Sequence, residues 1–216
     1  MGESLLAEVS ARFDRAGVMV KTGTLIDASL VEAAVRRPPD GATPKGVESR
    51  SAHDPDANWT RQGRSRRPFF GYKVHIGVDE GSGLIRSRTL TPAKVYESEV
   101  ADALVLGDER AVYAHNAYEK RARRAALKGR GIKDCIQHRW TRSKATAPHW
   151  QQVLNKLIRR IRTGVEQTPD RVRGRLFSQI KGRYRLDRMR YRGLAANRLH
   201  LDLIAIAHNL YTAART

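Results

Sequence analysis

Residues 72–78 carry the feature that most constrains the fold, because apolar side chains occupy every second position of this segment. These side chains belong to Tyr72, Val74, Ile76 and Val78. The turn-forming sequence DEGSG follows, and the apolar run LIRSRTL returns after it at 84–90. Alternation on both sides of such a turn predicts a β-hairpin with one buried face.

The segments around this hairpin predict an α/β domain. After it we expect a short helix, a strand, a basic helix, a strand and two helices, at 97–106, 111–114, 119–131, 132–139, 150–165 and 197–214. Before it, residues 4–16 have a helical stripe that Gly17 ends, and residues 18–35 mix strand-like and helix-like signals. This order indicates a mixed sheet, and it is also the order of a ribonuclease-H-like fold.

The segment 36–67 separates the N-terminal elements from the hairpin. It is polar and rich in Pro, Gly, Ser and charged residues, and it contains no phosphate-cradling glycine motif. This composition predicts a long mobile loop.

The charge of the chain points to a polyanionic partner. There are 41 Lys and Arg residues against 22 Asp and Glu residues, a formal net charge of +19. Between Lys156 and Arg192 the chain has 13 basic and 3 acidic residues, with Phe177, Tyr184 and Tyr191 interleaved. Such a tract favours contact with nucleic-acid phosphates and occasional stacking on bases, although a solvated helical face is the simpler alternative.

The composition excludes several other kinds of site. The single Cys135 rules out an intramolecular disulfide and a multi-cysteine zinc site, and its apolar surroundings indicate a buried thiol. The histidines lack zinc-site spacing, and no Walker motif occurs. No apolar run approaches the roughly 20 residues that span a bilayer, and no signal peptide is recognisable, so we expect a cytoplasmic, nucleoid-associated protein without a membrane partner.

Two carboxylates are candidates for chemistry. Asp27 follows the apolar pair Leu25-Ile26, and a carboxylate at a strand end can bind Mg²⁺, but Asp is also a preferred helix N-cap. Glu166 ends a basic helical segment, where an exposed or salt-bridged Glu is the alternative. The pair Asp108-Glu109 precedes the strand at 111–114 and therefore lies at the opposite end of this strand from position 115.

Five segments in order along nearly the whole chain resemble one known family. They are VKTGTLIDASLVEAA, FGYKVHIGVDEGSGLIRSRTLTPA, GDERAVYAHNAY, WQQVLNKLIRRIRTGVE and MRYRGLAANRLHLDLIAIAHNL. Together they are similar to the catalytic domain of bacterial insertion-sequence DDE transposases. The most similar group is the insertion-sequence-five family, within the insertion-sequence-four-like set.

The resemblance implies a ribonuclease-H-like catalytic domain at 19–216, with residues 1–18 as a remnant of an N-terminal helical region. It also implies an Asp-Asp-Glu triad that binds two Mg²⁺ (or Mn²⁺) ions for phosphoryl transfer on DNA. The first Asp falls on Asp27 and the Glu on Glu166, which are the expected metal ligands. We expect Arg162 and Lys181, which match the family signature, to contact DNA. We expect the same of three further residues of the basic tract, Arg183, Arg190 and Arg192.

Three features depart from the family pattern. The second Asp is expected within VYADKAY, but this chain has VYAHNAY, so His115 occupies the catalytic position. A neutral imidazole offers one nitrogen and no negative charge, and it suits Mg²⁺ poorly. Lys181 stands fifteen positions after Glu166 instead of seven, because QTPDRVRGR intervenes. The family has an N-terminal helical region ahead of the position of residue 1, and we expect this chain to lack it.

We therefore expect a transposition protein whose DNA cleavage and strand transfer at insertion-sequence ends are impaired by His115. Two alternatives stay open. One is a non-catalytic, truncated transposase that binds DNA and inhibits transposition, and the other is a decayed product without a function. The expected partners are double-stranded DNA, as terminal repeats and as target, and a second copy of the chain or a full-length transposase.

Overall fold

The computed structural model describes residues 2–35, 53–62, 67–140, 146–167 and 176–215, with backbone alone at 62, 67, 163–167, 176 and 178. The strands are β1 (Thr24–Glu32), β2 (Asn58–Gln62), β3 (Arg67–Asp79), β4 (Ile85–Pro92), β5 (Ala111–Ala114) and β6 (Lys133–Ile136). The α-helices are α1 (Gly2–Arg15), α2 (Glu97–Val100), α3 (Arg121–Gly129), α4 (His149–Gln167), α5 (Leu176–Tyr184) and α6 (Leu194–Ala213). Two short 3₁₀ helices, η1 (Ala101–Leu104) and η2 (Asn116–Tyr118), complete the described elements.

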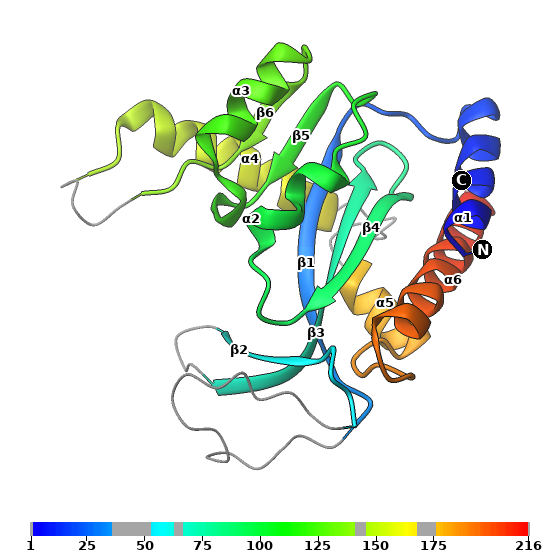
Figure 1. Ribbon diagram of the computed structural model, residues 1–216. Helices are drawn as coiled ribbons and strands as arrows, with labels where there is room; N and C mark the ends of the chain where they lie inside the picture. The colour runs from blue at the N-terminus through cyan, green and yellow to red at the C-terminus, as the bar shows by residue number, and fades with distance from the viewer. Residues whose placement is uncertain (1, 36–52, 63–66, 141–145, 168–175, 216) are drawn as a thin grey trace.

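The strands form one mixed sheet with β1 at its centre (Figure 1). On one side β1 pairs antiparallel with β3, and on the other it pairs in parallel with β5, which pairs in parallel with β6. Strands β2 and β4 share the outer edge of β3, with β2 along residues 67–71 and β4 along 72–78. An antiparallel hairpin joined to parallel strands in this order is a ribonuclease-H-like sheet, as the sequence predicts.

The alternating hairpin buries the face that the sequence indicates. Its apolar residues join a core cluster with Leu6 of α1, Ile180 of α5 and Leu201 of α6. Figure 1 shows α1 and α6 side by side next to this part of the sheet. In the turn, Asp79 accepts hydrogen bonds from the backbone amides of Lys21 and Ser82, both 2.8 Å long. Asp79 therefore stabilises the turn.

The parallel strands are covered on both faces. On one face, Ile26 and Val112 pack with Leu104 of η1 and Leu127 of α3. On the other, Ile158 of α4 packs against a cluster that includes the buried thiol of Cys135. Helix α4 and the α5–α6 pair therefore lie over the same face of the sheet, on either side of β1.

Two sequence-based expectations require correction. Residues 36–67 do not form a single loop, because Asn58–Gln62 pairs with β3 as β2, where Trp59 packs on Phe70 with ring centroids 5.2 Å apart. Residues 36–52 and 63–66 of that segment lie outside the described residues. Asp27 is not a helix N-cap, because the segment around it forms β1 and pairs with strands on both sides. Within the described ranges, no helix is long and apolar enough to cross a membrane.

Candidate functional site

Asp27 stands on the central strand at the point where the neighbouring strand ends. β1 pairs with β5 as far as Ile26 and Ala114, so the edge of β1 that continues from Asp27 is not covered by β5. Water reaches 55% of the Asp27 side chain. Loss of hydration nevertheless raises the pKa of this carboxyl group, while Arg162, the Ala28 amide and His115 act in the opposite direction.

His115 follows the last residue of β5, and the parallel register places it beside Asp27. Its Nδ1 accepts a hydrogen bond of 3.3 Å from the Ala117 amide and caps η2. Loss of hydration and the charge of Arg162 lower the pKa of His115, so the ring is neutral at pH 7. Because Nδ1 is the acceptor, the ring hydrogen lies on Nε2. The ring in this state has no free nitrogen lone pair for a metal.

Helix α4 brings a cation to Asp27. Ile158, Arg162 and Glu166 are spaced by four residues and therefore share one face of the helix. Ile158 packs on the parallel strands, and Arg162 Nη2 lies 3.7 Å from Asp27 Oδ1. Glu166 lies one turn beyond Arg162 in the last part of α4, and its side chain is outside the described residues. The structure thus brings Asp27, His115 and Arg162 together.

A second carboxylate near Asp27 was missed by the sequence analysis. Glu97 begins α2 and is half-buried. Loss of hydration raises the pKa of its carboxyl group, Lys73 lowers it, and Asp27 raises it. The fully buried Tyr118 hydroxyl has no hydrogen-bond partner among the described residues. Apart from desolvation, the charges of Glu97 and then Asp27 contribute most to raising the pKa of this hydroxyl.

The other acidic candidates do not belong to the site. At the opposite end of β5, Asp108 pairs with Lys21 at 3.0 Å and with the buried Arg86. Glu109 is buried and accepts a hydrogen bond of 2.6 Å from the Gly107 amide. Both carboxylates stabilise the start of β5, in agreement with their exclusion on sequence grounds.

The fit of these residues to a divalent cation can be judged from the ligands. Among the described residues, no group of three or more His, Cys, Asp or Glu side chains could hold a metal ion. At position 115 the imidazole does not fit the role of the expected Asp. Mg²⁺, however, keeps several waters and is often held by one or two carboxylates. Asp27, which Arg162 faces at 3.7 Å, is one such carboxylate.

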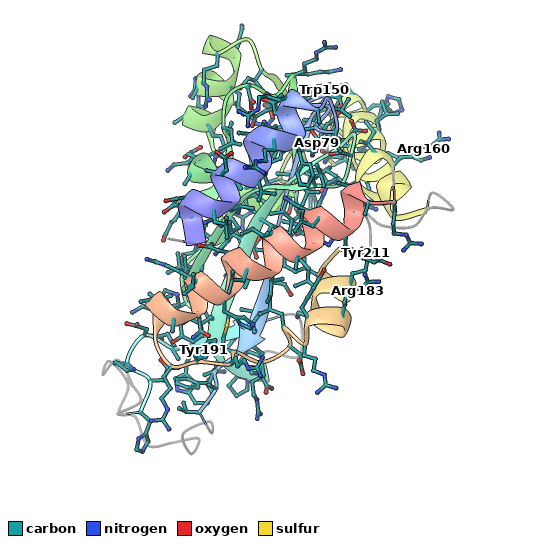
Figure 2. The ribbon with its side chains drawn as sticks, turned by 90° about the vertical axis from the view of Figure 1, so that its right-hand side faces the viewer. Asp79, Trp150, Arg160, Arg183, Tyr191 and Tyr211 are labelled. Carbon is teal, nitrogen blue, oxygen red and sulfur yellow. The ribbon has the colours of Figure 1, made fainter. Side chains whose placement is uncertain are left out.

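The expected DNA-binding residues lie on different surfaces. Arg190 and Arg192 are exposed between α5 and α6. The Arg183 guanidinium of α5 lies 3.6 Å from the ring centroid of Tyr211 of α6, and Figure 2 shows the two side chains together. Lys181 is half-buried and donates a hydrogen bond of 2.9 Å to the Leu30 carbonyl. This bond attaches α5 to β1, and loss of hydration lowers the pKa of Lys181.

The order of the sheet, with the carboxylate on its central strand and the basic helix beside it, defines a ribonuclease-H-like domain. A family model described as the transposase DDE domain matches residues 19–210. The chain therefore belongs to the transposase DDE domain family, a family of DNA transposition proteins.

Two solved structures are similar to the chain. The first is titled "Crystal structure of a pre-cleavage Mos1 transpososome", with 12% identity and a TM-score of 0.38, over 99% of this chain and 58% of that one. The second is titled "Mos1 transposase paired-end complex with left transposon end", with 12% identity and a TM-score of 0.29, over 74% of this chain and 57% of that one. The chain thus spans less than two thirds of the length of both proteins.

Proposed function

We propose that this protein binds double-stranded DNA at insertion-sequence ends and that its DNA cleavage and strand transfer are impaired by His115. The observation that carries the proposal is the placement of Asp27 on β1 beside His115 at the end of β5, with α4 over the same face of the sheet. The matched segments favour the insertion-sequence-five family.

The proposed roles follow from the charges. A bound Mg²⁺ or Mn²⁺ supplies activation of the nucleophile and stabilisation of the leaving oxygen in phosphoryl transfer. Asp27, with Glu166 if its side chain reaches the same edge, would hold the cation. The neutral His115 contributes no negative charge there, and Arg162 already offsets the charge of Asp27. Exposed arginines beyond α5, Arg190 and Arg192, bind DNA phosphates in this proposal.

Nicking of supercoiled plasmid tests the cleavage part. The plasmid carries the DNA from both sides of the coding sequence, and Mg²⁺ or Mn²⁺ is added to wild type, His115→Asp, and each of these combined with Asp27→Asn. We expect nicking by His115→Asp well above that of wild type, and its loss in the Asp27→Asn double variant. Equal nicking by wild type and His115→Asp would show that His115 does not impair the reaction.

A non-catalytic role is the second candidate, favoured by the imidazole at position 115. In this case the protein occupies insertion-sequence ends, or pairs with a second copy or a full-length transposase, and thereby inhibits transposition. Co-expression with an active transposase of the same element would lower its transposition frequency. Inhibition that persists in Asp27→Asn supports this role, since binding does not need the carboxylate.

A further inference from the structure

The ends of α5 and α6 bring two arginines to one tyrosine. The guanidinium carbon of Arg183 lies 3.6 Å from the ring centroid of Tyr211, and that of Arg215 lies 5.2 Å from it. Arg215 Nη1 also donates a hydrogen bond of 2.5 Å to the Tyr211 hydroxyl. Figure 2 shows Arg183 and Tyr211 together near the end of α6. We name these three residues the Arg-Tyr-Arg cluster.

The two positive charges of the cluster are not balanced by acids. The guanidinium carbons of Arg183 and Arg215 are at most 8.8 Å apart, which is the sum of their distances to the ring centroid. Both residues are exposed, and neither forms an ion pair with a carboxylate in the described part of the chain. Elsewhere the structure pairs its arginines with carboxylates, as at Arg86, Arg88 and Arg123. An anion that bonds both guanidiniums would remove their mutual repulsion.

The Tyr211 hydroxyl adds a third donor to the cluster. Because its oxygen accepts a hydrogen bond from Arg215, its own hydrogen is free to be donated, and no acceptor takes it among the described residues. Contact with Arg183 lowers the pKa of this hydroxyl, and Arg215 acts in the same direction. A more acidic hydroxyl is a stronger hydrogen-bond donor. Two guanidiniums and one hydroxyl are a donor set that suits a phosphate group.

The cluster is fixed to the strand that carries the candidate site. Lys181, two residues before Arg183 in α5, donates a hydrogen bond of 2.9 Å to the Leu30 carbonyl. Leu30 follows Asp27 by three residues on β1. The helix that presents Arg183 is therefore attached directly to the central strand of the sheet, and its position does not depend on a long loop.

The cluster is separate from the exposed arginines between α5 and α6. Helix α6 has 20 residues and is therefore about 30 Å long. Arg190 and Arg192 precede its first residue, whereas Tyr211 and Arg215 lie at its far end. In Figure 2 the labelled Tyr191 and Tyr211 mark these two ends. A phosphate bound by the cluster is thus a contact additional to those proposed for Arg190 and Arg192.

We propose that Arg183, Arg215 and Tyr211 together bind one phosphate of a DNA backbone, with both guanidiniums and the hydroxyl as donors. A guanidinium carbon lies roughly 4 Å from the phosphorus of a phosphate that it bonds, so a single phosphate reaches both arginines. The site reads no base and therefore positions the DNA without selecting its sequence. This inference rests on the proposed function, because DNA is the ligand there.

The alternative role of the cluster is structural. The contact between Arg183 and Tyr211 joins α5 to α6, and a basic residue near the end of a helix offsets the helix dipole. A structural role predicts that substitutions lower stability and leave the DNA affinity of the folded protein unchanged. A phosphate site predicts the opposite result, since both arginines are exposed.

Fluorescence anisotropy of a labelled DNA duplex tests the site, with the full chain titrated at several salt concentrations in the presence of a chelator. The duplex has the sequence that flanks the coding sequence. We expect Arg183→Gln with Arg215→Gln to weaken binding at low salt by about tenfold, because charge-assisted hydrogen bonds are lost. The slope of log K against log salt should fall by about 0.9, the value for one phosphate. A fall of about two would show two separate contacts and overturn the shared phosphate.

Matched variants exclude other causes. Arg12→Gln with Arg15→Gln removes the same charge from α1, where both residues pair with Glu8, and should bind DNA as wild type. Tyr211→Phe keeps the ring but removes the hydroxyl, so it should weaken binding by about threefold without a change of slope. Wild-type affinity of Tyr211→Phe would overturn the role of the hydroxyl. Thermal unfolding of each variant checks that it is folded.

Two comparisons identify what has failed if the result differs. Inorganic phosphate added at constant ionic strength should not displace the duplex in the millimolar range, and displacement would show a site for a free anion and overturn the assignment to DNA. If wild type binds no DNA, the proposed function and the phosphate site both fail. If wild type binds DNA and the double arginine variant has the same affinity and slope, only the phosphate site is overturned.

Discussion

Arg162 Nη2 lies 3.7 Å from Asp27 Oδ1, so a guanidinium from α4 faces the carboxylate on the central strand. The pair is partly exposed, and such pairs contribute little to stability. Its importance is electrostatic. Loss of hydration raises the pKa of Asp27 and Arg162 opposes this, whereas loss of hydration and Arg162 both lower the pKa of His115. Arg162 therefore favours the charged form of Asp27 and the neutral form of His115.

Removal of Arg162 should affect metal and DNA in opposite directions. We expect Arg162→Gln to bind Mn²⁺ about threefold to tenfold more tightly, because a competing positive charge beside Asp27 is lost. DNA binding should weaken, because a phosphate contact is lost. The control is Arg160→Gln on the exposed side of the same helix (labelled in Figure 2), which should leave Mn²⁺ binding unchanged. Weaker Mn²⁺ binding in Arg162→Gln would show that the Arg162 charge does not compete with a cation at Asp27.

Restoration of a carboxylate at position 115 should strengthen the site. The parallel register places this side chain beside Asp27. An Asp at position 115 can also accept the hydrogen bond that the Ala117 amide now donates to His115. His115→Asp should therefore bind Mn²⁺ more tightly by about tenfold or more, measured by a titration that follows the electron paramagnetic resonance of free Mn²⁺. His115→Asn, which keeps the cap but adds no charge, should bind as wild type. If His115→Asn strengthens Mn²⁺ binding as much as His115→Asp does, the negative charge at position 115 is not the cause of the tighter binding.

Loss of Arg123 should destabilise the fold around the site. Its guanidinium is buried, and Arg123→Met leaves the Tyr118 and Ser98 carbonyls without this donor. We expect the free energy of unfolding to fall by about 2–4 kcal/mol in a urea titration. The exposed Arg121→Met on the same helix should change it by no more than about 0.5 kcal/mol. Similar losses for both variants would show that the buried bonds are not the cause.

The buried His75 predicts a loss of stability in acid. Its Nε2 lies 2.9 Å from Thr91 Oγ1, and loss of hydration, with Lys73, lowers its pKa to about 3. Below the unfolded value of 6.5, the unfolded chain binds a proton that the folded protein does not accept until about pH 3. The free energy of unfolding therefore falls across this window as pH falls, by up to about 1.4 kcal/mol per pH unit from this group.

Comparison with a variant isolates the contribution of His75, since other groups also titrate in this range. His75→Gln keeps a side chain that can bond Thr91 but does not bind a proton. Urea titrations between pH 6.5 and 4 should show a shallower loss of stability for His75→Gln than for wild type. Parallel curves would mean that His75 is not responsible.

The exposed arginines beyond α5 should set the salt dependence of DNA binding. Each phosphate contact contributes about 0.9 to the slope of log K against log salt, so Arg190→Ala with Arg192→Ala should reduce the slope by about two. A double variant of α1, Arg12→Ala with Arg15→Ala, removes the same charge from a helix where both residues pair with Glu8. It should leave the slope near the wild-type value. Equal slopes for wild type and the first variant would remove Arg190 and Arg192 from the interface.

The sequence predicts those parts of the fold whose pattern is local. The alternation in β3 and β4 and the apolar stripe of α4 suffice for their type and place. Strand β1 could not be assigned, because its end at 30–32 belongs to the segment LVEAAV, which has good helix formers. The strand conformation of 24–32 depends on pairing with β3 and, at 24–26, with β5. Strand β2 was missed for the same reason, since its polar residues gain their order from pairing with β3 and from Trp59 on Phe70.

The site was predictable to the extent that it follows the family pattern. The resemblance identified Asp27, His115 and Arg162, and the structure places these three together. Glu97 was missed because a Glu in the first turn of a helix is common for reasons unrelated to chemistry. Its relation to Asp27 depends on where the connection after β4 returns to the sheet, and no local pattern gives that position.

The central place of β1 also has a consequence for the order of assembly. Asp27 is synthesised early, but its neighbour at position 115 reaches it only after the hairpin, α2 and β5 have been made, and Arg162 follows later still. Pairings between such distant segments form slowly, because the entropy of closing a long loop is lost before the stabilising contacts are made. We therefore expect the site to be among the last features completed during folding. A partly folded chain would then have its basic residues before Asp27, His115 and Arg162 come together.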